Sequence, residues 1–342
     1  MSDTNAKITE EIRAKARELL SSGEIAAFLG FTSGSLPMTT RPFVAKRPGD
    51  ADKLIWNSFC VMNLANYLPA LLESLEPPRG PKDPPPAGPL PKVGVVATGC
   101  CSRNIVVQMQ ERQVDRSRLV ILGVSSRGMV DRKKVMAAAE GREPLKVEEG
   151  GHTLKVSGRD YELEIDRWSA VRDNCLTCAH NNPVISDYLI GPVSNRDVKD
   201  RFAQIEAIEA MPANARWKWF TDEIASCIRC YACRNACPLC YCPTCFVDDS
   251  RPQWVGKSTE PADTALFHIL RAFHCAGRCT DCGACESACP MGIKMRLFTR
   301  KLSKDAFNLF GAEAGLDPQA QPPLATYRPD DPEEFLIVEE KK

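Results

Sequence analysis

The chain has 342 residues, with 44 basic and 44 acidic side chains, 44% hydrophobic residues and a mean hydropathy of -0.26. We expect a soluble chain with room for two or three packed cores. A net charge of zero and a pI near 6.9 give no electrostatic reason to expect nucleic acid or an anionic membrane as partner. No apolar run reaches the roughly 18 residues of a transmembrane segment, and the first residues lack a signal-peptide pattern. The sequence therefore predicts a cytoplasmic protein without a transmembrane segment.

The first 76 residues are predicted to form an α/β unit. Apolar residues recur at helical spacing near the start, which indicates a helix to about residue 21: Ile8, Ile12, Ala16 and Leu19. A strand is expected over 25–31, and a further helix between Cys60 and Pro77. Eight prolines fall within residues 77–91, so we predict an extended linker over 77–92.

Residues 93–212 are predicted to be a second α/β stretch. Apolar runs at 93–97 and 119–122 enclose a turn and a helical pattern, which is typical of a βαβ unit with a parallel strand pair. Residues 152–165 alternate in polarity and predict a β-hairpin closed near Gly158. Helical patterns return over 198–211 and 217–225.

The chain contains 17 cysteines, and most of them lie between Cys227 and Cys289. Such crowding in a reduced protein favours metal binding over packing. The spacing C-x2-C-x2-C-x3-C-P occurs twice within residues 213–311, at Cys227, Cys230, Cys233 and Cys237, and at Cys279, Cys282, Cys285 and Cys289. This is the spacing of bacterial two-cluster ferredoxins, so we predict an α+β ferredoxin-like domain there.

The spacing also predicts how the ligands divide. A tight loop can place three thiolates around one 4Fe-4S cluster, while the fourth cysteine reaches the other cluster. We expect one cluster on Cys227, Cys230, Cys233 and Cys289, and a second on Cys279, Cys282, Cys285 and Cys237. Structural zinc is the competing interpretation, but neither repeat divides into the paired knuckles that zinc sites use.

Between the repeats lie four more cysteines, which either form another metal site or pack as small apolar residues: Cys240, Cys242, Cys245 and Cys275. His268 and His274 lie on or just past an apolar helix over 265–273 and are expected to be packed or to have their tips in solvent. A closing helix is expected over 295–310. Residues 312–342 are rich in Pro, Asp and Glu and are predicted to be a loosely packed tail.

The amino-terminal cysteines suggest a third cluster. A cysteine at a strand end and a distant C-x2-C pair can converge at the carboxyl edge of a parallel sheet, and the candidate ligands are Cys60, Cys100, Cys175 and Cys178. The alternative is four separate buried cysteines. The same turn opens a helix, where Gly99, Ser102 and Arg103 are candidates for binding the phosphate of a flavin such as FAD. The turn does not have the G-x-G-x-x-G spacing.

Three stretches carry a family resemblance: Gly99-Cys100-Cys101-Ser102-Arg103, the residues 119–131, and Cys175-Leu176-Thr177-Cys178 with Asn182, Pro183 and Asp187. They resemble the β-subunit family of deazaflavin-reducing hydrogenases and formate dehydrogenases. The cysteine module, with its Cys237-Pro238-Leu239-Cys240-Tyr241-Cys242 extension, is similar to the iron-sulfur subunits of sulfhydrogenases and anaerobic sulfite reductases. Together the two resemblances cover about residues 50 to 300. The sequence departs from the family pattern at Ser126, where many relatives have a cysteine, and at Cys101, where they do not.

The resemblance implies a subunit that passes electrons between a catalytic oxidoreductase partner and a flavin or iron-sulfur carrier, within a hetero-oligomeric complex of an anaerobe. Such a complex would be a hydrogenase, a formate dehydrogenase or a heterodisulfide-reductase-like assembly. The rival prediction is a flavin-dependent reductase with its own active site at the Gly99 turn, and a third is a zinc-stapled interaction module. The sequence shows no acid/base pair, Ser-His-Asp order or P-loop that argues for independent catalysis.

Overall fold

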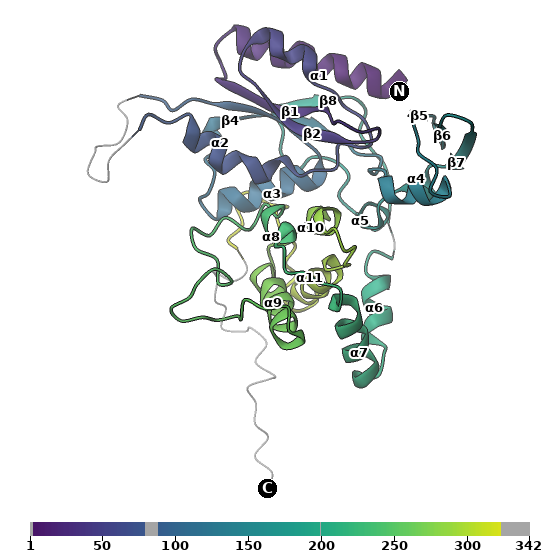
Figure 1. Ribbon diagram of the computed structural model, residues 1–342. Coiled ribbons are helices and arrows are strands. Elements are labelled where there is room, and N and C mark those ends of the chain that lie inside the picture. The colour runs from purple at the N-terminus through teal and green to yellow at the C-terminus, as the bar shows by residue number, and fades with distance from the viewer. Residues whose placement is uncertain (1–2, 79–87, 199, 323–342) are drawn as a thin grey trace.

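The computed structural model describes residues 3–78, 88–198 and 200–322 (Figure 1). Its larger sheet has five strands in the order β2-β1-β3-β4-β8, with β2 antiparallel to β1 and the others parallel. These strands are β1 (Ala27–Ser33), β2 (Thr40–Ala45), β3 (Val93–Ala97), β4 (Leu119–Val124) and β8 (Tyr188–Ile190). β3 and β4 are buried along their whole length, which accounts for their unbroken apolar sequences. The βαβ unit predicted from the sequence is confirmed.

Three helices pack on this sheet: α1 (Asp3–Ser21), α2 (Leu68–Ser74) and α3 (Gly99–Gln110). Figure 1 shows α1 on one face, and α2 and α3 on the other. The apolar stripe of α1 is buried against the sheet, as its spacing predicts. Short 3-10 helices lie at Pro48–Lys53, Leu64–Tyr67, Arg116–Arg118 and Trp168–Ala170. Residues 79–87 of the predicted proline-rich linker lie outside the described residues.

A smaller antiparallel sheet has the order β5-β6-β7. Its strands are β5 (Lys146–Glu149), β6 (Thr153–Ser157) and β7 (Glu162–Asp166), and it packs on α4 (Arg132–Ala138). Gly158 N donates to Tyr161 O over 3.0 Å, so the predicted hairpin closes where expected. β5 is not apparent from the sequence because three of its four residues are charged.

The cysteine module lies beyond α3, on the side away from the larger sheet (Figure 1). Its helices are α6 (Ala203–Glu209), α7 (Ala213–Ile224), α8 (Ala232–Asn235), α9 (Pro261–His274), α10 (Ala284–Ala288) and α11 (Arg296–Phe310), and α5 (Asp173–Leu176) precedes them. Val107 of α3 packs against Leu239 and Cys275 of the module. α3 therefore contacts both the sheet and the module. None of the helices in the described ranges combines the length and apolar character needed to span a bilayer.

The start of the carboxyl-terminal stretch is packed on α3, which differs from the loose tail predicted over 312–342. Arg103 Nε donates to Ala314 O over 2.9 Å, and Gln110 Nε2 donates to Asp317 O over 2.9 Å and to Ala320 O over 3.0 Å. The difference arises because polar side chains on α3 bind backbone carbonyls, which composition does not reveal. Residues 323–342 lie outside the described residues.

Candidate iron-sulfur centres

The first cysteine loop brings Cys227, Cys230 and Cys233 together with Cys289 of the second repeat. These four residues line one cavity. Burial raises the pKa of the Cys227 thiol, and the nearby sulfur atoms of Cys289 and Cys230 raise it further. Burial also raises the pKa of Cys233 to about 11, with further contributions from Cys227 and Cys289. The residues brought together are the four that the crossed assignment combines.

The second loop brings Cys279, Cys282 and Cys285 together with Cys237 of the first repeat. These four residues also line one cavity. Burial raises the pKa of Cys285, and Cys237, Cys282 and Cys279 raise it further. Each cavity therefore holds three cysteines of one repeat and the fourth cysteine of the other.

Both loops have the same backbone conformation. Arg229 and Asp281 occupy equivalent positions, with φ of 53° and 58°, and so do Tyr231 and Gly283, with φ of 59° and 68°. Asp281 N donates to Cys279 Sγ over 3.4 Å, and the backbone of Arg229 makes the equivalent bond to the Cys227 sulfur. Left-handed residues in such loops turn successive N–H groups toward one concavity, which suits an anionic cluster.

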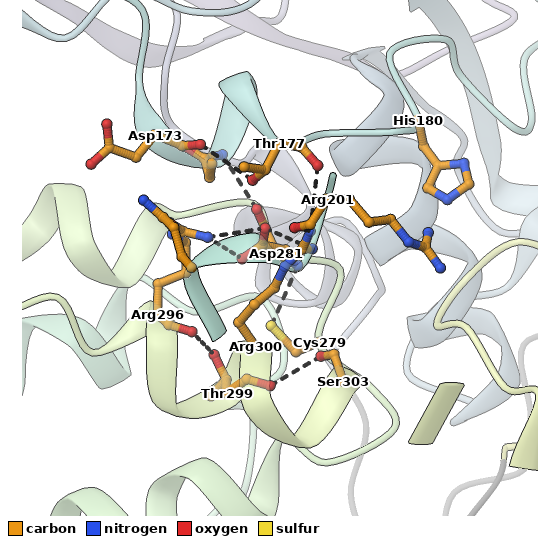
Figure 2. Close-up of polar contacts among 12 residues, drawn as sticks. Asp173, Thr177, His180, Arg201, Cys279, Asp281, Arg296, Thr299, Arg300 and Ser303 are labelled. Carbon is orange, nitrogen blue, oxygen red and sulfur yellow. Dashed lines mark hydrogen bonds and ion pairs between the residues drawn. The ribbon is translucent and has the colours of Figure 1, made fainter. Parts of the chain in front are cut away.

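A buried carboxylate anchors the second loop to α11. Figure 2 shows Asp281 between Arg296 and Arg300, beside Cys279. Arg296 Nη1 lies 3.1 Å from Asp281 Oδ1, and Arg300 Nη1 lies 2.9 Å from Oδ2. Arg300 also donates to Thr177 O over 3.3 Å, next to Cys178. The second loop is thereby connected to the segment that carries the C-x2-C pair.

The second loop is also bonded to α5 and its preceding residue. Arg172 Nη2 donates to Gly283 O over 2.7 Å, and Asn174 Nδ2 donates to Asp281 O over 3.3 Å. The four residues that form these two bonds are buried. The contacts fix the module against the amino-terminal part of the chain.

Two of the four cysteines between the repeats, Cys240 and Cys275, lie beside Cys237. Hydrogen bonds from the Cys240 and Cys275 thiols lower the pKa of Cys237 well below its usual range. Cys242 is exposed, and Cys245 hydrogen-bonds with Arg234. Within the described residues, no three His, Cys, Asp or Glu side chains are arranged to hold a single metal ion. The two cavities differ from a single-ion site, because each of the four cysteines that hold a 4Fe-4S cluster binds a different iron.

Two side chains of α9 reach the cavities, and neither is among the site residues predicted from the sequence. His268 Nε2 lies 3.3 Å from Cys227 Sγ, and Arg271 Nη2 donates to Cys233 O over 3.0 Å. Burial lowers the pKa of His268 to about 4, with further contributions from Arg271 and Arg229. The i, i+3 spacing of these two residues on an apolar helix was the only sequence feature that could have indicated a site. Packing residues have the same spacing just as often.

The structure brings together three of the four amino-terminal candidates. Burial raises the pKa of Cys100 to about 12, and the sulfur atoms of Cys178 and Cys175 add to the shift. Cys60 lies apart from them: its Sγ is 3.7 Å from Asn57 Oδ1, and the charge that acts on it is Glu149. Cys60 therefore belongs to the core of the sheet, which its distance in the sequence could not indicate.

The turn at Gly99 is closed by the chain itself. A Cβ added at Gly99 would lie 2.1 Å from His180 O. Ser102 is fully buried, donates to Gly99 O over 2.9 Å and accepts from Val184 N over 3.0 Å. Arg103 is bound to Ala314 O. The interpretation of Gly99, Ser102 and Arg103 as a flavin phosphate site thus disagrees with the structure, because protein groups occupy that turn.

Residues 223–293 match the family model of the 4Fe-4S dicluster domain. This stretch contains both cysteine repeats. The fold and this match therefore define the class as a protein with a 4Fe-4S dicluster domain next to a mixed α/β region.

Part of the chain is similar to β-subunits of F420-dependent formate dehydrogenases. The chain is 32% identical over 124 residues to the F420-dependent formate dehydrogenase subunit beta of Methanocaldococcus jannaschii, a match that covers 36% of this chain and 31% of the relative. It is 35% identical over 98 residues to the F420-dependent formate dehydrogenase 1 subunit beta of Methanococcus maripaludis, which covers 29% and 24%. The resemblance to these β-subunits is confirmed, although the match spans less than a third of their length.

A solved structure of the F420-reducing NiFe hydrogenase complex from Methanosarcina barkeri also contains a similar chain. The match covers 66% of this chain and 91% of that one, at 16% identity and a TM-score of 0.39.

Proposed function

We propose that the chain is the electron-transfer subunit of a multisubunit oxidoreductase, and that it binds two 4Fe-4S clusters with ligands crossed between the repeats. The observation that carries this proposal is the pair of cavities, each lined by three cysteines of one repeat and the fourth of the other. Iron-sulfur clusters supply one-electron transfer, and burial and hydrogen bonds to sulfur set their potentials.

A third iron site at Cys100, Cys175 and Cys178 is part of the proposal. The effects of Cys175 and Cys178 on Cys100, and of Cys175 on Cys178, support it, and Cys60 is left out of the ligand set. Cys100 also acts electrostatically on Cys282 of the second cavity. An electron entering at the third site would therefore pass to the second cluster and then to the first, where Cys230 is exposed.

The proposed partner is a catalytic oxidoreductase subunit, and the substrate binds to that partner and not to this chain. The curated relatives are subunits of F420-dependent formate dehydrogenases, which favours a formate-oxidising partner in a hetero-oligomer. The cytoplasmic location expected from the sequence remains a prediction.

For the flavin implied by the resemblance, we propose a different place from the Gly99 turn. A cavity of about 270 Å³ lies at the carboxyl ends of β4 and β8, where α/β sheets bind ligands. Ser125 Oγ is buried there without a hydrogen-bond partner in the described residues, and Arg167 is buried beside Glu149. FAD binding to the anaerobically purified chain should weaken in Arg127→Ala, which alters the cavity wall, and stay unchanged in Arg103→Lys. The opposite result would return the flavin to the Gly99 turn.

Iron and acid-labile sulfide analysis of the anaerobically purified chain tests the cluster proposal. Two clusters require about eight irons, and a third 4Fe-4S cluster raises the number to about twelve. We expect Cys178→Ala to lose about four irons, while Cys60→Ala, at a thiol that is more buried than Cys178, keeps them all. An iron content near four, or mostly zinc, in the parent chain would reject the dicluster. Equal iron in parent and Cys178→Ala would reject the third site alone.

A further inference from the structure

Helix α9 lies in the long insertion between the two repeats. One of its side chains, Arg271, contacts a residue of the first cavity and lines the second. Arg271 is only 4% exposed. Its Nη2 donates to the backbone carbonyl of Cys233, a residue of the first cavity. The same side chain lines the second cavity together with Cys237 and Cys285.

The guanidinium of Arg271 has no carboxylate partner at ion-pair distance within the described part of the chain, and its Nε is buried without a hydrogen bond there. The charges that act on it are instead the sulfur atoms of Cys285, Cys237, Cys275 and Cys233. Two other buried arginines have carboxylate partners: Arg296 pairs with Asp281 and Glu286, and Arg103 pairs with Glu313. Arg172 and Arg229 resemble Arg271 in having no ion pair in the described residues, but Arg271 alone of the three lines the second cavity and also bonds to a residue of the first. A buried cation without a carboxylate is costly, so an anionic neighbour is needed to balance it.

We propose that Arg271 is a shared charge between the two clusters, which raises the reduction potentials of both. This inference rests on the proposed function. Reduction adds one negative charge to a cluster, and a fixed positive charge nearby stabilises the reduced form more than the oxidised form. Arginine suits this position because its guanidinium stays protonated in a buried site.

The matched control is Arg229, a second buried arginine that lies near one cavity only. Its Nη2 donates to Gly256 O and to the Tyr231 hydroxyl, both over 2.9 Å. It acts on Cys227 of the first cavity, and it does not line the second. A charge removed there should affect one cluster alone.

The experiment is a redox titration of the anaerobically purified full chain, monitored by electron paramagnetic resonance, with iron analysis of each variant. We expect Arg271→Met to lower the midpoint potentials of both clusters at full iron content, and Arg271→Lys to retain most of the parent values. Arg229→Met should lower one potential and leave the other unchanged. Arg271 lies near the proposed clusters and is not one of their ligands. A variant that keeps its iron but has lower potentials therefore indicates an electrostatic role, and a variant that loses iron indicates a structural role.

Unchanged potentials in an iron-replete Arg271→Met, or a change in one cluster only, would overturn the proposal. If Arg271→Met loses iron, the comparison moves to Arg271→Gln and Arg271→Lys, which both keep a hydrogen-bond donor. Lower potentials in the Gln variant alone support the shared charge, and loss of iron from all three variants makes Arg271 a structural residue. A parent chain without clusters would instead reject the proposed function.

Discussion

Cys237 and Cys289 decide whether the two repeats are independent. Each lines the cavity of the opposite repeat. Because serine is a poorer ligand for iron than thiolate, we expect Cys289→Ser to remove the same paramagnetic signal as Cys230→Ser. Cys237→Ser should remove the other signal, together with Cys282→Ser. The spectra of the four reduced variants make the comparison, and a shared loss in Cys289→Ser and Cys282→Ser would contradict crossed ligation.

The residues of the two repeats could be predicted because their spacing is local. A loop with two residues between cysteines permits few arrangements, and both loops have the same left-handed positions. Cys60 and the Gly99 turn could not be assessed in this way. Their surroundings come from Asn57 and Glu149 in one case, and from His180 in the other. Such contacts depend on the packing of loops, which periodicity does not describe.

At the scale of elements, α10 depends on the glycine that precedes it. Gly283 has φ of 68°, and an added Cβ would lie 2.8 Å from Arg172 Nη2 and from Asn174. Gly283→Ala should cost about 1–2 kcal/mol for the left-handed backbone, and more because Arg172 and Asn174 must move. We expect faster loss of the cluster absorbance in denaturant than in the parent.

Gly311, which ends α11, is the control for this substitution. It has φ of 62° and nothing within 4 Å of an added Cβ. Gly311→Ala therefore carries the backbone cost without the clash. Equal rates of bleaching in the two variants would mean that contacts of Gly283 with α5 do not stabilise the module.

The sequence of α9 predicts the helix itself but not the contacts of its polar side chains. Its apolar residues predict a buried helix over 265–273, and the structure has Pro261–His274. The same pattern treats His268 and Arg271 as ordinary members of the helix. Only the fold brings them to Cys227 and Cys233.

At the scale of the whole molecule, Glu313 joins segments that are distant in the sequence. Its carboxylate lies 2.7 Å from His180 Nε2 and 2.9 Å from Arg201 Nη1. Burial would raise the pKa of Glu313, but the hydrogen bond to His180 and the charges of Arg103 and Arg201 lower it to about 2. A lowered carboxyl pKa stabilises the fold fully above the ordinary value of 4.5, and this contribution is lost as the pH falls toward 2.

Glu313→Gln should weaken the attachment of the segment at 312–320 at neutral pH, because the ion pairs with His180 and Arg201 are lost while the bonds from α3 to its backbone remain. We expect a cost of about 1.5–3 kcal/mol, typical of hydrogen bonds to a charged group. Hydrogen exchange in peptides of this segment, compared between variant and parent at each pH, measures it. The ratio of exchange rates should be largest at pH 7 and approach one between pH 4.5 and 2. Equal exchange at pH 7 would show that Glu313 does not hold the segment.

The crossed arrangement of the cavities also bears on how the protein is made. The first loop ends at Cys233, yet its cavity includes Cys289, and the second cavity needs Cys237 from much earlier in the chain. A nascent chain on the ribosome therefore exposes several thiols of the first repeat before the set of four cysteines of either cavity is complete. Exposed thiolates are open to oxidation. Under the proposed crossed ligation, the second cluster cannot be inserted before residue 285 is translated, and the first cannot be inserted before residue 289 is translated.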